Sequence, residues 1–193
     1  MTDSLRTFAD LARRRRSNLR IDPEQPVDPE LVGQLIAVAA TAPNHYRTHP
    51  WRFRVVTGAG REGLGTALAA ELRADAGFNP VTDEPKVTKA LSKYLRAPVM
   101  VVVASRRGAD PVATLENRDA VAAAVQTLLL AATAAGLASL WSTGGAATSA
   151  EVARFCGFDP SDSTVGLIYL GWPTAELEPA ERPEPEIIRI DRA

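Results

Sequence analysis

The sequence predicts one domain in which helices surround a buried sheet, and three observations point to it. The chain has 193 residues, of which 46% are hydrophobic, and this suits a single domain with a substantial core. Residues Pro98–Ala104 are apolar without alternation, which is typical of a strand buried on both faces, so we expect this strand at the sheet centre. Val121–Ala135 is rich in alanine and leucine and predicts a helix that ends at Gly136.

Two helices are predicted before the first strand. The first begins with Asp3 or Ser4 as its N-cap, because its apolar residues then share one face. Those apolar residues are Leu5, Phe8, Leu11 and Ala12. This helix ends in arginines, which suit the negative end of the helix dipole. After a loop over residues 17–26, the second helix begins at Asp28-Pro29-Glu30, where an N-cap residue precedes a proline in the first turn.

Residues Phe53–Thr57 have the composition of a strand and stop at the turn signal Gly58-Ala59-Gly60. A helix is predicted from about Arg61 to Ala76. A weaker helix follows over Lys86–Leu95, and it ends before Pro98 because a residue that precedes proline disfavours helical geometry.

Residues 120–150 carry no charged side chain, which raises the question of a membrane span. The polar Gln126, the break at Gly136 and the dominance of alanine argue against a span. We therefore expect a central helix that is buried on nearly all sides, with a partner subunit as one candidate cover.

Three elements are predicted after this helix. Residues 138–142 form a short strand that ends in Thr143-Gly144-Gly145, and Ser149 caps a further helix that reaches about Phe155. Residues 165–171 are a second apolar strand.

The last part of the chain is rich in proline and acidic residues. Residues 179–185 cannot form a helix or an inner strand, whereas Ile187–Ile190 recovers strand composition. An arm that ends in such a segment often adds to the edge of a sheet, in its own chain or in a neighbour. The sequence therefore predicts a domain over 1–178, an extended arm over 179–193 and a dimer.

Composition excludes several functions. The net charge of −1 argues against a nucleic-acid or anionic-membrane surface, since these need a concentrated positive field. The single cysteine, Cys156, excludes an internal disulfide and a cysteine metal cluster. With a polar start that lacks an apolar secretory core, these features predict a cytoplasmic protein.

The segment Ala42–Phe53 holds both histidines of the chain between two apolar segments. It is either a loop that presents donors and flat surfaces to a ligand or an ordinary connector from helix to strand. His45 and His49 are four residues apart, but the flanking prolines disfavour helical spacing and no nearby cysteine or carboxylate completes a metal set, so we expect no metal. Phosphate loops, dinucleotide fingerprints and serine elbows are absent from the sequence.

Two further segments could face a ligand. Arg15, Arg16 and Ser17 follow the first helix and either hold a phosphate through guanidinium forks or form a solvated helix end. The glycines after Thr143 either let the backbone approach a ligand or form a simple turn.

Together these segments resemble the FMN-dependent nitroreductase family, and most closely its short bacterial members. Four landmarks in the family's order carry the resemblance, which covers nearly the whole chain. They are Arg15-Arg16-Ser17, the loop from Ala42-Pro43 to Pro50-Trp51-Arg52-Phe53, the 119–136 helix that leads to Trp141 and Thr143-Gly144, and Leu170-Gly171-Trp172-Pro173.

The resemblance implies an α+β sandwich with a mostly antiparallel sheet flanked by helices, in a homodimer that exchanges its C-terminal strands. It implies that FMN binds at the dimer interface, near Trp141 among other residues. Arg15, Arg16 and Ser17 would meet the phosphate, ribityl chain and pyrimidine edge, and the backbone of Thr143 and Gly144 would lie beside the isoalloxazine. The other subunit would supply His45, His49, Pro50 and Trp51.

The implied activity moves two electrons from NADH or NADPH through the flavin to a flat acceptor, such as a nitroaromatic or a quinone, in a ping-pong sequence. No side chain acts as a nucleophile, because the flavin carries the redox chemistry. Two alternatives stay open. One is a flavin enzyme of the same fold with other chemistry, such as a dehalogenase, a deazaflavin user or a flavin-fragmenting enzyme; the other is a non-catalytic flavin-binding protein.

The chain departs from the family pattern at three positions. His49 stands where relatives often have glutamine before the Pro-Trp pair, and histidine donates in a pH-dependent way. Leu19 stands where many members have lysine or arginine, so that Arg20 either takes that role or the flavin is tuned less strongly. Ser142 replaces a basic residue that commonly follows the strand tryptophan.

Overall fold

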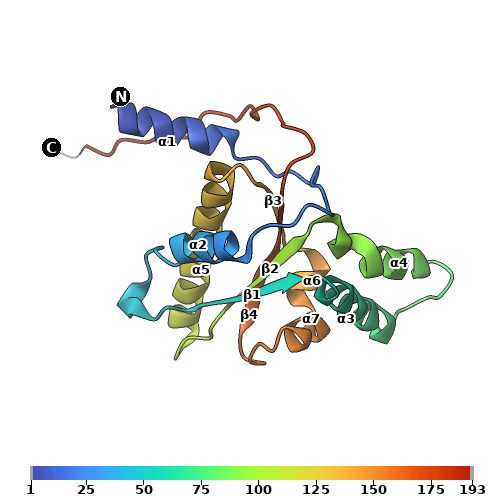
Figure 1. The fold of residues 1–193 in the computed structure, drawn as a ribbon. Helices are drawn as coiled ribbons and strands as arrows, with labels where there is room; N and C mark the ends of the chain where they lie inside the picture. Colours follow the sequence, from blue (N-terminus) through green and yellow to red (C-terminus); the bar gives the residue numbers. More distant parts are fainter. Residues whose placement is uncertain (1, 192–193) are drawn as a thin grey trace.

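A computed structural model describes residues 2–191 and shows a four-stranded antiparallel sheet between two layers of helices (Figure 1). The order of the strands across the sheet is β1-β2-β4-β3. Their bounds are β1 (Trp51–Thr57), β2 (Val99–Ser105), β3 (Ala138–Ser142) and β4 (Ser163–Gly171). The α+β sandwich predicted from the sequence is confirmed.

The two inner strands form the centre of the core. Every residue of β2 is buried, which confirms the strand predicted from the apolar run Pro98–Ala104. In β4 every residue after Ser163 is also buried. The outer strands β1 and β3 are therefore the two edges of the sheet, and they are separated by the full width of β2 and β4.

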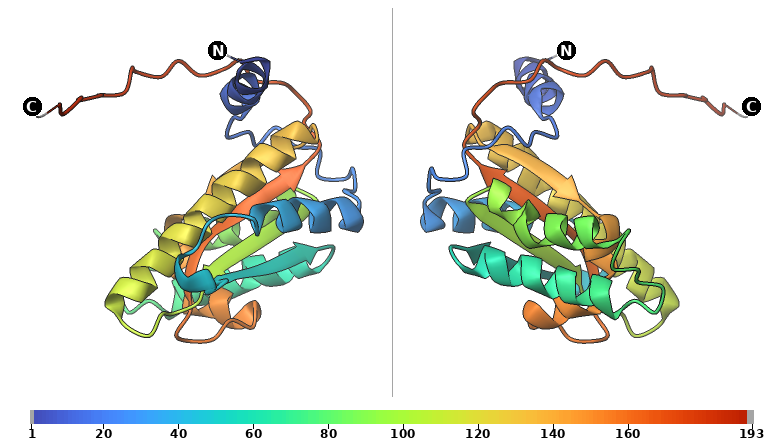
Figure 2. Two further views of the ribbon diagram at one scale, coloured as in Figure 1. Left: turned by 90° about the vertical axis from the view of Figure 1, so that its left-hand side faces the viewer. Right: turned by 90° about the vertical axis from the view of Figure 1, so that its right-hand side faces the viewer.

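One face of the sheet is covered by two helices, α2 (Pro29–Ala39) and α5 (Pro111–Ala134). The opposite face is covered by α3 (Gly60–Ala74), α4 (Glu84–Ser92) and α7 (Ala150–Phe155), as the two side views in Figure 2 show. Helices α3 and α4 pack closely at Gly65, which has no side chain. A Cβ at this position would stand 2.6 Å from the carbonyl oxygen of Leu91.

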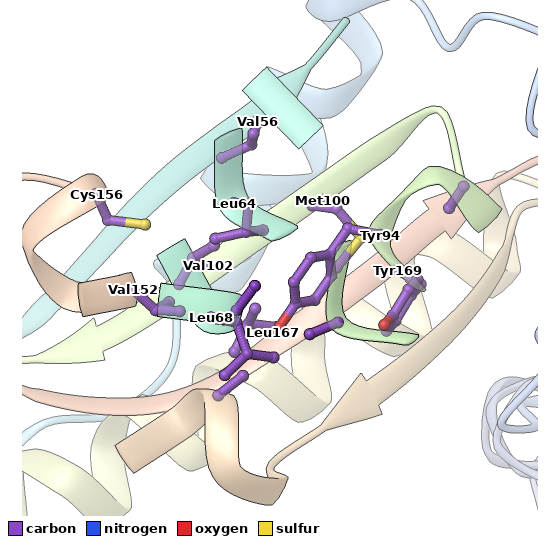
Figure 3. Close-up of a cluster of buried hydrophobic side chains, with 14 of the residues drawn as sticks. Val56, Leu64, Leu68, Tyr94, Met100, Val102, Val152, Cys156, Leu167 and Tyr169 are labelled. Atoms are coloured by element: carbon purple, nitrogen blue, oxygen red, sulfur yellow. The ribbon is translucent and has the colours of Figure 1, made fainter. Parts of the chain in front are cut away.

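Aromatic and aliphatic side chains fill the layer under α3 and α4 (Figure 3). Tyr94, from the 3₁₀ turn η2 (Lys93–Arg96), is 1% exposed and stacks on Tyr169 of β4 with ring centroids 6.1 Å apart. Burial raises the pKa of both phenols, so both stay neutral. The layer between the sheet and these helices is therefore a buried apolar core.

The first helix, α1 (Asp3–Arg14), lies at the outside of the fold and buries none of its residues. Its N-cap is Thr2 instead of the predicted Asp3 or Ser4, because the Thr2 side chain accepts from the backbone of Leu5. The predicted apolar face is present, yet Leu5 and Phe8 are 52% and 55% exposed.

Other boundaries also differ from the prediction. Helix α5 begins at Pro111, ten residues before the predicted Val121, because Asp110 caps it by accepting from Ala113 and a proline occupies the first turn. The glycines after Thr143, for which a simple turn was one of two alternatives, begin a short helix, α6 (Gly144–Thr148). Ser149 caps α7 as predicted.

After β4 the chain forms an extended arm that passes α1 and projects beyond it (Figure 2). Ile187, Ile188 and Ile190 of this arm are 76%, 73% and 77% exposed and join no strand within the chain. Exchange of this segment between subunits stays a prediction. Within residues 2–191, none of the helices has the length and apolar character that a membrane crossing requires.

Candidate functional site

The arginine segment predicted to bind phosphate lies against the edge strand β3. The backbone N–H of Asn18 donates to the carbonyl oxygen of Ser139 at 2.9 Å, and Ser17 forms an isolated parallel bridge with Ser139. Arg15 and Arg16 are therefore held beside the start of β3, where α5 ends.

Three arginines form a positive cluster at this point. Burial lowers the pKa of the Arg15 guanidinium, and the nearby charges of Arg182 and Arg16 lower it further. None of the three makes an ion pair with a carboxylate in the described part of the chain, and Arg16 instead donates to the neutral carbonyl of Glu178. Three guanidinium groups without an ion-pair partner favour an anion as their ligand.

The C-terminal arm brings Arg182 to this cluster. The arm runs beside the segment after α1, where Asn18 donates through Nδ2 to Ala175 at 3.0 Å and the backbone of Thr174 donates to Arg20 at 2.8 Å. A cavity of about 190 Å³ lies between the arm and the end of α5. Its lining includes Arg14, Arg16, Asn18, Gly136, Pro173 and Glu176. The position of Arg182 beside this cluster could not be predicted from the sequence, because Arg182 lies in a proline-rich tail without periodicity.

Trp141 has a packing role at the edge of the sheet. Its indole Nε1 donates to the carbonyl of Val165 at 3.3 Å, and the ring occupies the space above Gly166, where a Cβ would overlap it. The side chain thus fixes β3 to β4, and contact with a cofactor stays a prediction for this residue.

Thr143 and Gly144 follow β3 and are both exposed. The Thr143 side chain makes no capping bond to α6, and the first N–H groups of any helix lack intrahelical acceptors. A cleft of about 700 Å³ opens beside them, and Arg118 of α5 also lines it. Backbone donors at the end of β3 can therefore reach a ligand.

The loop before β1 has an unusual backbone. Tyr46, Arg47 and His49 have φ angles of 52°, 53° and 45°, which is the left-handed region that side chains other than glycine rarely adopt. Each residue in this region raises the conformational free energy of the folded chain by about 1–2 kcal/mol. Contacts with the surrounding structure must therefore hold these three residues in place. The loop includes the 3₁₀ turn η1 (His45–Arg47), and Tyr46 at its tip is 87% exposed.

The structure does not bring this loop to the arginine cluster within one chain. His45, His49, Pro50 and Trp51 stand before or at the start of β1, whereas the other candidate residues lie along β3 at the opposite edge. His49 instead faces Trp51, with ring centroids 5.7 Å apart in an edge-on arrangement. A site that draws these two groups from different subunits stays a prediction. Residues 2–191 hold no group of three histidine, cysteine or acidic side chains that could bind a metal.

Comparisons with known proteins agree with this fold. The chain is 31% identical over 160 residues to YdjA, a predicted NAD(P)H nitroreductase of Escherichia coli (strain K12), and the match covers 82% of this chain and 84% of YdjA. A nitroreductase-like family protein from Bacillus cereus superposes with a TM-score of 0.82 at 24% identity, covering 94% of this chain and 95% of that one.

Two solved structures contain a flavin. A predicted nitroreductase of Desulfovibrio desulfuricans in complex with FMN has a TM-score of 0.67 at 25% identity, covering 91% of each chain. An iodotyrosine deiodinase bound to FMN and 3-iodo-L-tyrosine has a TM-score of 0.70 at 25% identity, covering 96% of this chain and 99% of that one. The model of the nitroreductase family matches residues 12–172. On this match, which spans most of the chain, the protein belongs to the nitroreductase family.

Proposed function

We propose that this protein is a homodimeric FMN-dependent oxidoreductase that moves two electrons from NADH or NADPH to a flat acceptor such as a nitroaromatic or a quinone. The observation that carries the proposal is the arrangement along β3. An arginine cluster without a carboxylate partner lies at the start of this strand, and exposed backbone donors follow its end. A phosphorylated flavin needs these two features at its two ends.

At the phosphate end, Arg15, Arg16 and Arg182 supply the charge. Guanidinium groups suit phosphate because their planar forks donate two parallel hydrogen bonds to its oxygens. Ser17 is exposed next to them and can donate its hydroxyl to the ribityl chain or the pyrimidine edge.

At the ring end, the backbone N–H groups of Thr143 and Gly144 would lie by N5 and O4 of the isoalloxazine. Ser139 and Thr143 are four residues apart along an extended strand, which separates the two ends by about 13 Å. A Cβ at Gly144 would meet no atom within 4 Å, so the backbone there is open to a ring. When bound, FMN supplies the two-electron chemistry, in a ping-pong sequence with nicotinamide and acceptor.

The second subunit completes the site. The loop before β1 would bring His45, His49, Pro50 and Trp51 of one chain to the flavin held along β3 of the other. Such pairing also explains the exposed isoleucines of the arm, because residues 179–193 can cross to the partner and add a strand to its sheet edge. Residues 1–178 are then the FMN-binding domain. We place the protein in the cytoplasm, since its only cysteine excludes an internal disulfide.

A second candidate function has a specific observation in its favour. The likeness to the deiodinase that binds 3-iodo-L-tyrosine extends over nearly the whole chain, so reductive removal of a halogen from an aromatic ring is a chemistry that the same site could support. Deazaflavin use, flavin fragmentation and non-catalytic flavin binding have no such observation.

The test begins with an absorbance spectrum of the purified protein after incubation with FMN. We expect a bound flavin that NADH or NADPH bleaches anaerobically and that a nitroaromatic or a quinone reoxidises. A protein that takes up no flavin would contradict the proposal. Bound flavin that neither nicotinamide reduces, but that releases iodide from 3-iodotyrosine after chemical reduction, would favour the second candidate.

A further inference from the structure

Asn117 is a buried polar residue of α5 that contacts the loop before β1. Its side chain is 4% exposed, and its Oδ1 accepts from the hydroxyl of Thr48 at 2.7 Å. Its Nδ2 donates to the backbone carbonyl of Arg106, just after β2, at 3.1 Å. One amide thus joins the loop, the end of β2 and the helix.

Arg106 closes the same network from the other side. Its Nη2 donates to the carbonyl of Thr48 at 2.9 Å, and its backbone N–H donates to the carbonyl of Pro50 at 2.8 Å. At the start of the loop, Asn44 accepts from the backbone of His49 at 3.0 Å. The three left-handed residues therefore lie between anchored positions, beside the first half of α5 (Figure 2).

The chemistry of the amide explains why asparagine is needed here. A buried group must accept from a hydroxyl and donate to a carbonyl at the same time, and asparagine does both. A leucine at position 117 has a similar branched shape, but it would remove the acceptor for the Thr48 hydroxyl and the amide donor to the carbonyl of Arg106. Without this anchor, only the bonds from Arg106 and Asn44 oppose the strain at the left-handed residues, and we expect the loop to relax.

We propose that Asn117 is a positioning residue, which holds residues 44–50 in the strained conformation that carries His45 and His49 to the flavin of the partner subunit. The inference rests on the proposed function, because it assumes a bound flavin. The effect of Asn117 on the loop conformation can nevertheless be measured in the protein without flavin. Asn117 would touch neither cofactor nor substrate and would act through the loop alone.

The test uses Asn117→Leu with Asn79→Leu as its matched control. Asn79 also holds a loop, through its Oδ1 and the backbone N–H of Val81 at 2.9 Å, but between α3 and α4. Trypsin can cut after the exposed Arg47 once the loop loosens. We expect cleavage at this bond to rise at least tenfold in apo Asn117→Leu and FMN to bind at least tenfold more weakly, with both values unchanged in the control.

Substitutions of Thr48 test the contact from the loop side. Thr48→Val removes the hydroxyl and should repeat both effects even where Asn117→Leu fails to fold, whereas Thr48→Ser keeps the hydroxyl and should behave like wild type. Unchanged cleavage in Thr48→Val and Asn117→Leu would overturn the inference. Faster cleavage of these two variants with unchanged FMN affinity would also overturn the inference. A wild-type protein that binds no FMN would instead refute the proposed function and, with it, the role of Asn117 in positioning the loop for the flavin. The cleavage data would still show whether Asn117 anchors the loop.

Discussion

The two edges of the sheet hold unlike halves of the proposed site. At the β1 edge, a short strained loop is fixed by the side chains of Asn117 and Arg106 and carries histidines and aromatic rings. At the β3 edge, the arginine segment and the arm are held mainly by backbone bonds and bring Arg15, Arg16 and Arg182 together. Since β2 and β4 separate the edges, we propose that the site forms between two subunits and that each edge supplies a different half of it.

The largest effect should follow from shortening the arm. Removal of residues 186–193 keeps Arg182 but takes away Ile187, Ile188 and Ile190, which are exposed in a single chain. We expect monomers by light scattering and a greater loss of FMN affinity than any single substitution at the β3 edge causes. A truncated protein that stays dimeric would show that the arm does not hold the subunits together.

The next effect concerns the phosphate end of the β3 edge. Arg15→Ala should remove a charge-assisted contact worth roughly 1.5–3 kcal/mol and weaken FMN binding at least about tenfold, as isothermal titration would measure. Arg182→Ala should act in the same direction. Arg13→Ala is the control, because Arg13 pairs with Asp10 on exposed α1. Equal affinity in Arg15→Ala and wild type would remove Arg15 from the site.

A smaller effect concerns how the β3 edge is attached to the sheet. Gly166→Ala places a methyl group where the indole of Trp141 lies, and overpacking of this kind costs about 1–3 kcal/mol in the free energy of unfolding. Gly33→Ala is the control, since a Cβ there meets no atom within 4 Å. Urea titration measures the free energy of unfolding of both variants. Equal stability of Gly166→Ala and wild type would show that the indole of Trp141 does not pack tightly against Gly166.

The smallest effect lies in the core between the edges. Burial raises the pKa of the Cys156 thiol from 9.0 to about 11, so the unfolded chain releases this proton at lower pH than the folded one. The contribution of the neutral thiol to stability is therefore full below pH 9.0 and is lost as the pH rises toward 11. The free energies of unfolding of wild type and Cys156→Ala should therefore converge as the pH rises through this window. A difference that stays constant would contradict a raised pKa for the Cys156 thiol.

The parts of the fold that follow local rules could be predicted from sequence. The apolar run before Ser105 and the cap at Ser149 depend on neighbouring residues alone, and both are confirmed. The left-handed loop could not be predicted, because Tyr46 and Arg47 have no intrinsic preference for that region and long-range bonds hold the loop there. Arg182 acquires its place only through the course of the arm. The early start of α5 was not predicted, because its first turns carry Glu116, Arg118 and Asp119 and the charge-free apolar run marks only the later part of the helix.

Subunit complementation tests the shared site most directly. One variant loses the β1-edge half through His45→Ala and His49→Ala, and the other loses the β3-edge half through Arg15→Ala and Arg182→Ala. Each homodimer should be nearly inactive. Subunits exchanged at random should regain about a quarter of the wild-type flavin sites and of the nitroaromatic reduction, because half of the dimers are mixed and each mixed dimer holds one intact site. A mixture as inactive as its parents would contradict a site built from both chains.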